Sequence, residues 1–227
     1  MKKTLILLLA LMMGSVAMAQ DFDFCIGPKI GYQTAKLSYD KSEVVHSLKN
    51  NLTVGAFGRV QIGNLYVQPE LLWFRTENDF NWTLSNESTS FLGFDPNVSL
   101  TLNTMNLQVP IMIGYQVLDL KIAKFRVQAG PTANFVLKDT QIFEANFDEL
   151  ATAKPEFDIN KVNWGLQAGI GADVLGFTID INYNFGLSKV FKPGLFENNP
   201  ISNYVGPDNI DKTKQNLFMV TLGYKFL

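Results

Sequence analysis

Residues 162–187 read VNWGLQAGIGADVLGFTIDINYNFGL, and apolar side chains occupy every second position of this run. They fall on even numbers from Val162 to Val174 and on odd numbers from Phe177 to Leu187. The positions between them hold Gly, Asn, Gln, Thr and Asp. A β-strand turns successive side chains to opposite faces, which a helix does not do. The run therefore predicts two strands, each with one apolar and one polar face.

The dipeptide Leu175-Gly176 between the two strands predicts a two-residue hairpin turn. Such a turn pairs residues symmetrically about itself, so that every apolar residue meets an apolar residue. The expected partners are Val174 with Phe177, Ala172 with Ile179, and Ile170 with Ile181. A slip of one residue would break this match along the whole hairpin, so the pattern also predicts the register.

Six further stretches alternate in the same way, at 24–35, 52–62, 65–73, 105–115, 125–137 and 216–226. Short and long connections alternate along the chain. The short ones are 63–64, 116–123 and 175–176, and the long ones are 36–51, 75–102, 138–161 and 188–215. Gly63-Asn64 is again a hairpin signal, and its leading glycine suits a type II′ turn. This connectivity predicts an all-β fold, an eight-stranded antiparallel up-and-down barrel with tight turns at one end and long loops at the other.

The composition of the two faces indicates which one points outward. The polar face is mostly Gly, Asn, Gln, Thr and Ser with few charges, which suits the cramped interior of a small barrel. The apolar face carries large aliphatic and aromatic side chains, as contact with lipid requires. A closed barrel also pairs its backbone groups without water. We therefore expect a transmembrane barrel with short periplasmic turns and long extracellular loops; a soluble lipocalin-like carrier, with the apolar face inside, is the alternative.

Seven charged residues fall on the polar face and would point into the barrel interior. They are Lys29, Arg59, Glu70, Arg126, Asp173, Asp180 and Lys225. Burial of a charge is costly unless it is paired, so these residues predict a structural network of ion pairs. The 63–64 turn places Arg59 opposite Gln68 and diagonal to Glu70, within reach of a long side chain. The alternative is an ion-conducting or gated path.

The N-terminus has the order of features of an export signal. Lys2 and Lys3 precede an apolar stretch at 5–13, and Ala17-Met18-Ala19 is a small-x-small cleavage pattern. We expect a signal peptide at 1–19 and one barrel domain at 20–227.

Charge and composition exclude several functions of the 227-residue chain. The formal net charge is −2, so no basic field exists to bind nucleic acid. Cys25 and His46 are the only residues of their types, which excludes an internal disulfide, a multi-cysteine metal site and a two-histidine zinc site. We expect no metal and no cofactor; the run 208–211, Asp-Asn-Ile-Asp, lacks the spacing of a calcium loop.

Several short motifs, in order, give the chain a resemblance to a known family. They are GPKIGY at 27–32, YVQPELL at 66–72, LQVPI at 107–111, AGP at 129–131, the glycine-rich run 165–171, YNFGL at 183–187 and GYKF at 223–226. These residues resemble the PorT-like outer-membrane β-barrel (porin family) proteins of Gram-negative bacteria. The resemblance implies an eight-stranded barrel in outer-membrane lipid, inserted by the outer-membrane assembly machinery. Some relatives are linked to type IX protein secretion, and no catalytic or ligand residue transfers from the family.

The expected function is a structural or binding role through the extracellular loops, because the most varied chemistry lies there. The acidic loop 138–161 is one surface that could meet a cation or a basic partner. A small-solute channel is the alternative. A barrel hydrolase is a further one, which could start only at His46 and Ser47 with Glu43 nearby. Adjacent strand residues point to opposite faces and this stretch is predicted as a loop, so we expect no enzyme.

Overall fold

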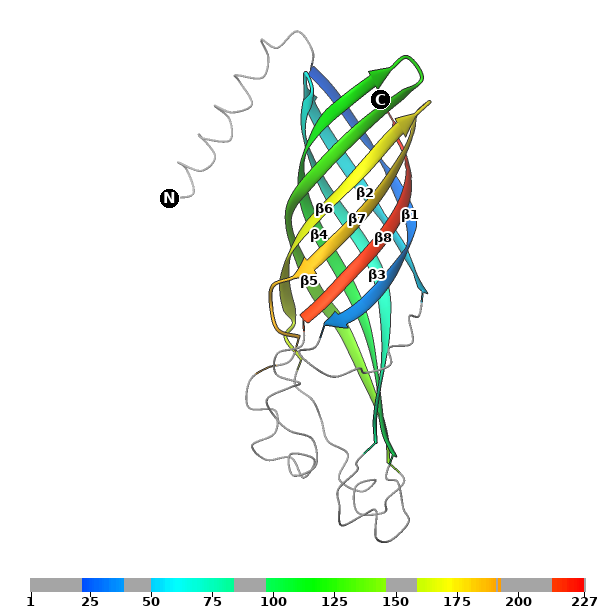
Figure 1. The fold of residues 1–227 in the computed structure, drawn as a ribbon, viewed down its shortest axis with the longest axis vertical. Coiled ribbons are helices and arrows are strands. Elements are labelled where there is room, and N and C mark those ends of the chain that lie inside the picture. The colour runs from blue at the N-terminus through cyan, green and yellow to red at the C-terminus, as the bar shows by residue number, and fades with distance from the viewer. Residues whose placement is uncertain are drawn as a thin grey trace, which may run out of the picture.

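The computed structural model describes residues 22–38, 50–83, 97–145, 159–190, 192 and 214–226. Within them the chain forms eight β-strands in one closed barrel (Figure 1). The strands are β1 (Phe22–Ser38), β2 (Asn50–Ile62), β3 (Leu65–Thr83), β4 (Asn97–Leu120), β5 (Ala123–Ala145), β6 (Val162–Val174), β7 (Phe177–Gly186) and β8 (Lys214–Tyr224). No helix among the described residues is long and apolar enough to cross a membrane.

Every strand pairs antiparallel with its neighbour in sequence, and β1 pairs with β8 to close the barrel. The closing seam runs from Lys29 opposite Gly223 to Ser38 opposite Lys214. Closure supplies hydrogen-bond partners to the two strands that would otherwise be edges. The predicted eight-stranded up-and-down barrel is confirmed.

The hairpin of β6 and β7 has the predicted register. Ile170 lies opposite Ile181, and Val174 lies opposite Phe177. Leu175 and Gly176 between them have φ angles of 49° and 91°, and positive φ at both central residues defines a type I′ turn. At the β2–β3 turn only Gly63 has positive φ, 57°, which is the pattern of the predicted type II′ turn.

Three strands are longer than the sequence predicts by ten or more residues, and β1 and β2 are longer by five or fewer. β3 continues to Thr83, β4 spans Asn97–Leu120 and β5 continues to Ala145. The predicted loops 75–102 and 138–161 are therefore partly strand, and the predicted connection 116–123 shrinks to the turn Lys121-Ile122. The β4–β5 register shifts at 105/106 and at 116/118. These irregularities break the period of two in β4 and β5, so the alternation ends before those strands do.

The three turns lie at one end of the barrel, named the turn end: 63–64, 121–122 and 175–176. At the opposite end, the loop end, β3, β4 and β5 run on past the other strands as a twisted ribbon (Figure 1). In this extension β4 stays paired on both sides, with Val98 opposite Trp82 of β3 and Ala145 of β5.

The apolar face points outward, as predicted. Trp164 is 58% exposed and Ile170 is 57% exposed, whereas Gln167 on the same strand is 1% exposed. The soluble-carrier alternative needs the opposite orientation and does not fit the structure.

The outer surface has the layered composition of a membrane-spanning band. β7 shows it in one strand, with Phe177 near the turn end, Ile179 and Ile181 in the middle, and Phe185 near the loop end. The Phe177 ring packs edge-to-face on Tyr224, with centroids 5.2 Å apart. At the other end the centroids of Tyr183 and Phe185 are 4.6 Å apart. An aliphatic band between two aromatic girdles matches a bilayer core and its interfaces.

Candidate functional site in the barrel interior

The seven charged residues predicted to face the interior all lie on the inner side of the barrel wall. Six of them are at most 5% exposed, and the side chain of Lys225, near the turn end, is 22% exposed. They come from six strands and from the residue after β8, so ring closure is what brings them together.

Lys29 holds two carboxylates from two other strands. Its Nζ lies 2.6 Å from Oε1 of Glu70 on β3 and 2.7 Å from Oδ2 of Asp180 on β7. The amide of Gln68 donates a second hydrogen bond to the same Glu70 oxygen, at 2.6 Å. The side chains of Lys29, Glu70 and Asp180 are 0% exposed.

Arg126 of β5 connects this group to a further carboxylate, that of Asp173 on β6. Its Nη2 lies 2.8 Å from Oδ1 of Asp180 and 2.9 Å from Oδ1 of Asp173. The same nitrogen donates to the hydroxyl of Thr178 at 2.6 Å, and Nη1 donates to the hydroxyl of Tyr66 at 3.1 Å. The guanidinium is therefore bound from β3, β6 and β7 at once.

Asp173 is shared by three cations. Its Oδ1 contacts Arg126, as described above. Its Oδ2 lies 2.5 Å from Nη1 of Arg59 and 3.2 Å from Nζ of Lys225. Arg59 also donates from Nε to Gln68 at 2.6 Å, the residue that sequence pairing places opposite it. Its ion pair is with Asp173, whereas Glu70, which the turn places within reach of Arg59, contacts Lys29.

Two aromatic rings complete the network, and sequence analysis did not assign them to it. The Tyr66 ring centroid lies 5.0 Å from Cζ of Arg59 and 5.5 Å from Cζ of Arg126. The Phe57 ring centroid lies 5.3 Å from Nζ of Lys29. Rings at such distances attract cations through their quadrupole. The sequence feature that could have identified them is their position, because both aromatic residues fall on the polar, inward face of the alternating strands.

The side chains of the network contact one another across the turn-end half of the interior. Arg59 and Asp173, for example, join β2 to β6, and an eight-stranded barrel is narrow enough for side chains to fill. Four cations face three carboxylates, so most of the charge is neutralised locally. This arrangement binds strands together, because each carboxylate contacts a cation from another strand or, for Asp173, also from the residue after β8.

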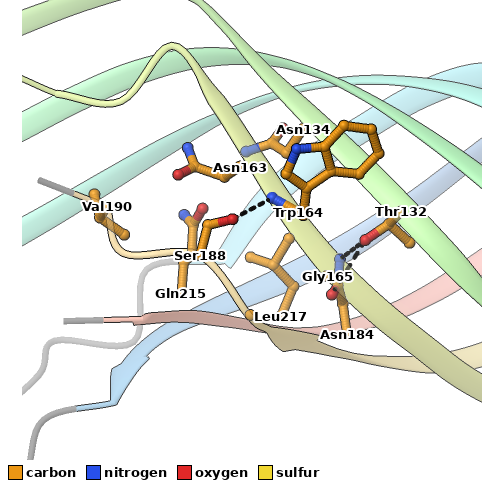
Figure 2. Close-up of a pocket in the computed structure, with 11 residues that line it drawn as sticks. Thr132, Asn134, Asn163, Trp164, Gly165, Asn184, Ser188, Val190, Gln215 and Leu217 are labelled. Atoms are coloured by element: carbon orange, nitrogen blue, oxygen red, sulfur yellow. Dashed lines mark hydrogen bonds between the residues drawn. The ribbon is translucent and has the colours of Figure 1, made fainter. Parts of the chain in front are cut away.

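Figure 2 shows a small pocket at the loop end, lined by residues of β5, β6, β7 and β8 and by Ser188 and Val190 after β7. Its volume is about 20 Å³, which accommodates one water molecule. Asn134 and Asn163 lie opposite each other in its wall, and Thr132 exchanges hydrogen bonds with Asn184. Ser188 accepts a hydrogen bond from the backbone N–H of Trp164 at 2.9 Å. The pocket is too small for an organic ligand.

Other sequence predictions fall on residues that the structure does not describe. These are the signal peptide 1–19, the residues Glu43, His46 and Ser47, most of the acidic loop 138–161, and the run 208–211. Asp139 of that loop is described, and its Oδ1 lies 2.9 Å from Nζ of Lys161. Among the described residues no three His, Cys, Asp or Glu side chains gather as a metal site, and Cys25 is buried as a free thiol.

A closed barrel that is apolar outside and charged inside defines the class of membrane-embedded β-barrel proteins. The chain belongs to the outer membrane protein beta-barrel domain family, whose model matches residues 18–192. The narrower PorT-like resemblance stays a prediction. No curated protein matches the sequence.

Several solved structures are similar to this chain over most of their length. Ail, the attachment invasion locus protein of Yersinia pestis, in complex with the heparin analogue sucrose octasulfate, is 13% identical, with a TM-score of 0.38. That match covers 90% of this chain and 99% of Ail. Neisserial surface protein A is 10% identical, with a TM-score of 0.39, and the match covers 91% of this chain and 100% of that protein.

Proposed function

We propose that this outer-membrane barrel has a structural or binding role through its loop end and does not conduct solutes. The observation that carries the proposal is the contact between Arg59 and Asp173, which joins β2 to β6 across the interior. A conducting path along the barrel axis would have to break it, together with the contacts of Lys29 and Arg126. Breaking several buried ion pairs together is costly, because the separated charges lose the partners that compensate their burial.

The extension of β3, β4 and β5 supports a binding role at the loop end. β4 alone spans 24 residues, whereas β7 spans 10. Strand residues beyond the aromatic girdle are not needed to cross lipid, so this ribbon carries the chain away from the membrane and presents surface there. A link to protein secretion, insertion by the assembly machinery and export by the 1–19 signal belong to the same proposal.

Absence of enzymatic activity is also part of the proposal. The network's carboxylates and amines are tied to one another by short ion pairs, and none of them lines the two larger depressions among the described residues. If the purified barrel hydrolysed lipid or peptide, and His46→Ala abolished that hydrolysis, this part of the proposal would be wrong.

Planar-bilayer recording tests the closed interior. The wild-type barrel should give no reproducible unitary conductance steps. The charge-neutral double variant Arg59→Ala/Asp173→Ala removes the contact across the interior and should give steps. The matched control is Asp119→Ala/Lys124→Ala, which removes an exposed pair 3.8 Å apart near the turn end and should stay silent. Heat-modifiable gel mobility verifies that each variant is folded. Steps from the wild type would contradict the proposal.

Site-specific photocrosslinking in intact cells tests the binding role. A photoreactive residue at exposed Lys189 of the loop end should give discrete protein adducts, whereas one at exposed Lys121 of the turn end should not give the same adducts. Identical adducts from both ends would indicate contacts unrelated to the loop end. Absence of any adduct from Lys189 and from other loop-end positions would contradict a protein-binding role.

A further inference from the structure

Three outward-facing rows of residues cross β3, β4 and β5 where these strands leave the apolar band. The register defines the rows as Trp73, Leu107 and Phe135, then Arg75, Met105 and Lys138, then Glu77, Asn103 and Thr140. The first row is apolar and aromatic and belongs to the loop-end girdle. The second, named the basic row, contributes two cations immediately beyond that girdle. The outer surface of these three strands therefore changes from lipid-facing to cationic between one row and the next.

The two cations of the basic row are exposed, and neither forms an ion pair with another described residue. Met105 lies between them, so Arg75 and Lys138 are two strand spacings apart, or about 10 Å. Two described acidic residues adjoin the basic row along the strands, Glu77 on β3 and Asp139 on β5. Glu77 lies in the third row, farther from the apolar band, and Asp139 pairs with Lys161.

The surface over these rows is hollowed. A depression of about 450 Å³ is lined by members of the second and third rows, by Thr76 and Thr104 between them, and by Asn51 of β2. That volume lies within the usual range for a small-molecule site. Thr76 and Thr104 turn their hydroxyls inward to Asn106, so the groups on the outer side are the cations Arg75 and Lys138, the Asn103 amide, the Thr140 hydroxyl and, in the third row, the Glu77 carboxylate. The two cations beside an amide and a hydroxyl suit the phosphate and hydroxyl groups of an anionic headgroup.

We propose that the basic row binds the phosphate of a glycolipid headgroup in the outer leaflet, with the acyl chains against the Trp73 row. The position beside the aromatic girdle selects a lipid as the occupant, because a ligand there has apolar surface below it and water above it. The charge selects phosphate, since each basic residue beside an anionic headgroup layer strengthens binding by about 1 kcal/mol. This inference rests on the outer-membrane barrel alone and not on the proposed loop-end partner.

Binding of diphosphoryl lipid A by the folded protein tests the proposal. The protein is held in dodecyl maltoside micelles, which carry no phosphate, and fluorescently labelled lipid A is titrated in. Arg75→Gln/Lys138→Gln should weaken binding by roughly tenfold to thirtyfold, which corresponds to about 2 kcal/mol for two cations. The matched control Lys121→Gln/Lys124→Gln removes two cations at the turn end and should bind as the wild type does.

Dephosphorylated lipid A separates a phosphate site from simple acyl-chain adsorption. The wild type should bind this probe about as weakly as Arg75→Gln/Lys138→Gln binds the diphosphoryl form. Equal affinity of the wild type for both probes would overturn the proposal. Equal weakening by the turn-end control would also overturn it, because the effect would then follow net charge and not the basic row. Heat-modifiable gel mobility confirms that each variant remains a folded barrel.

Discussion

Arg59 and Asp173 are 114 residues apart in sequence, and Nη1 of the arginine lies 2.5 Å from Oδ2 of the aspartate. Their strands, β2 and β6, are four places apart in a ring of eight, so they face each other across the barrel. The pair therefore ties opposite walls together, whereas backbone hydrogen bonds tie only neighbouring strands. Asp173 also holds Arg126 and Lys225, which makes it the anionic centre of the turn-end half.

Asp173→Asn should destabilise the barrel more than Arg59→Met does. The first change leaves three cations without their shared carboxylate, and removing one partner of a buried ion pair costs about 3–5 kcal/mol. The second change leaves Asp173 with Arg126 and Lys225, so its carboxylate stays paired. Urea unfolding in lipid vesicles measures both free energies of unfolding. An equal or larger loss in Arg59→Met would show that Asp173 is not the centre of the network.

The pairing partners inside the barrel could not be predicted from the sequence, although the inward orientation of the charged residues could. Alternation assigns a residue to a face, and a two-residue turn assigns its neighbour on the adjacent strand, as for Arg59 and Gln68. Lys29 and Asp180 come from β1 and β7, and no local pattern relates them. Their contact depends on how the closed ring staggers its strands, which is a property of the whole barrel.

The lipid-facing strands were predictable because the bilayer imposes a strict period of two. That constraint ends where the chain leaves the membrane, and prediction fails at the same place. Beyond Trp73 the outward positions of β3 hold Arg75 and Glu77, so the strand continues without an apolar face to mark it. Near the turn end, Val117 and Leu118 are consecutive and both exposed, and the register shift there hides the last residues of β4.

Arginine substitutions on the outer face should be costly in the middle of the apolar band and tolerated at its edge. Ile170→Arg and Ile181→Arg should each cost about 2–4 kcal/mol of folding free energy, since both positions face the lipid core. Ile122→Arg, in the exposed turn, should cost about 0–1 kcal/mol. The inward Gln167→Asn should cost much less than either core substitution. Folding titrations in vesicles measure all four, and equal values would contradict the assigned orientation.

Leu175→Asn should stabilise the β6–β7 hairpin. Leu175 has a φ of 49°, in the left-handed region, and its side chain is 81% exposed. Little side-chain packing therefore offsets the strain of this backbone conformation. That conformation costs a residue with a bulky side chain about 1–2 kcal/mol, and Asn-Gly is a preferred type I′ pair. We expect a gain of about 0.5–1 kcal/mol in urea unfolding. The control Leu175→Ala keeps the steric cost of a Cβ at positive φ, so its free energy of unfolding should rise little. An equal rise in both variants would show that the effect comes from removing an exposed apolar side chain.

Gly27→Ala should damage the seam between β1 and β8, whereas Gly58→Ala, on the neighbouring strand, should be tolerated. A methyl group at position 27 would meet the backbone carbonyl of Tyr224, which cannot move without opening the seam. At position 58 the same group would have no heavy atom within 4 Å. Overpacking of this kind costs about 1–3 kcal/mol, and here the strain falls on the one pairing that converts a sheet into a barrel.

Urea midpoints should therefore fall for Gly27→Ala only. Slower assembly of the heat-resistant gel form should accompany the loss, because the seam joins the first strand to the last and such long-range pairings form slowly. Equal stability and equal assembly rates of the two variants would show that the seam can widen without cost.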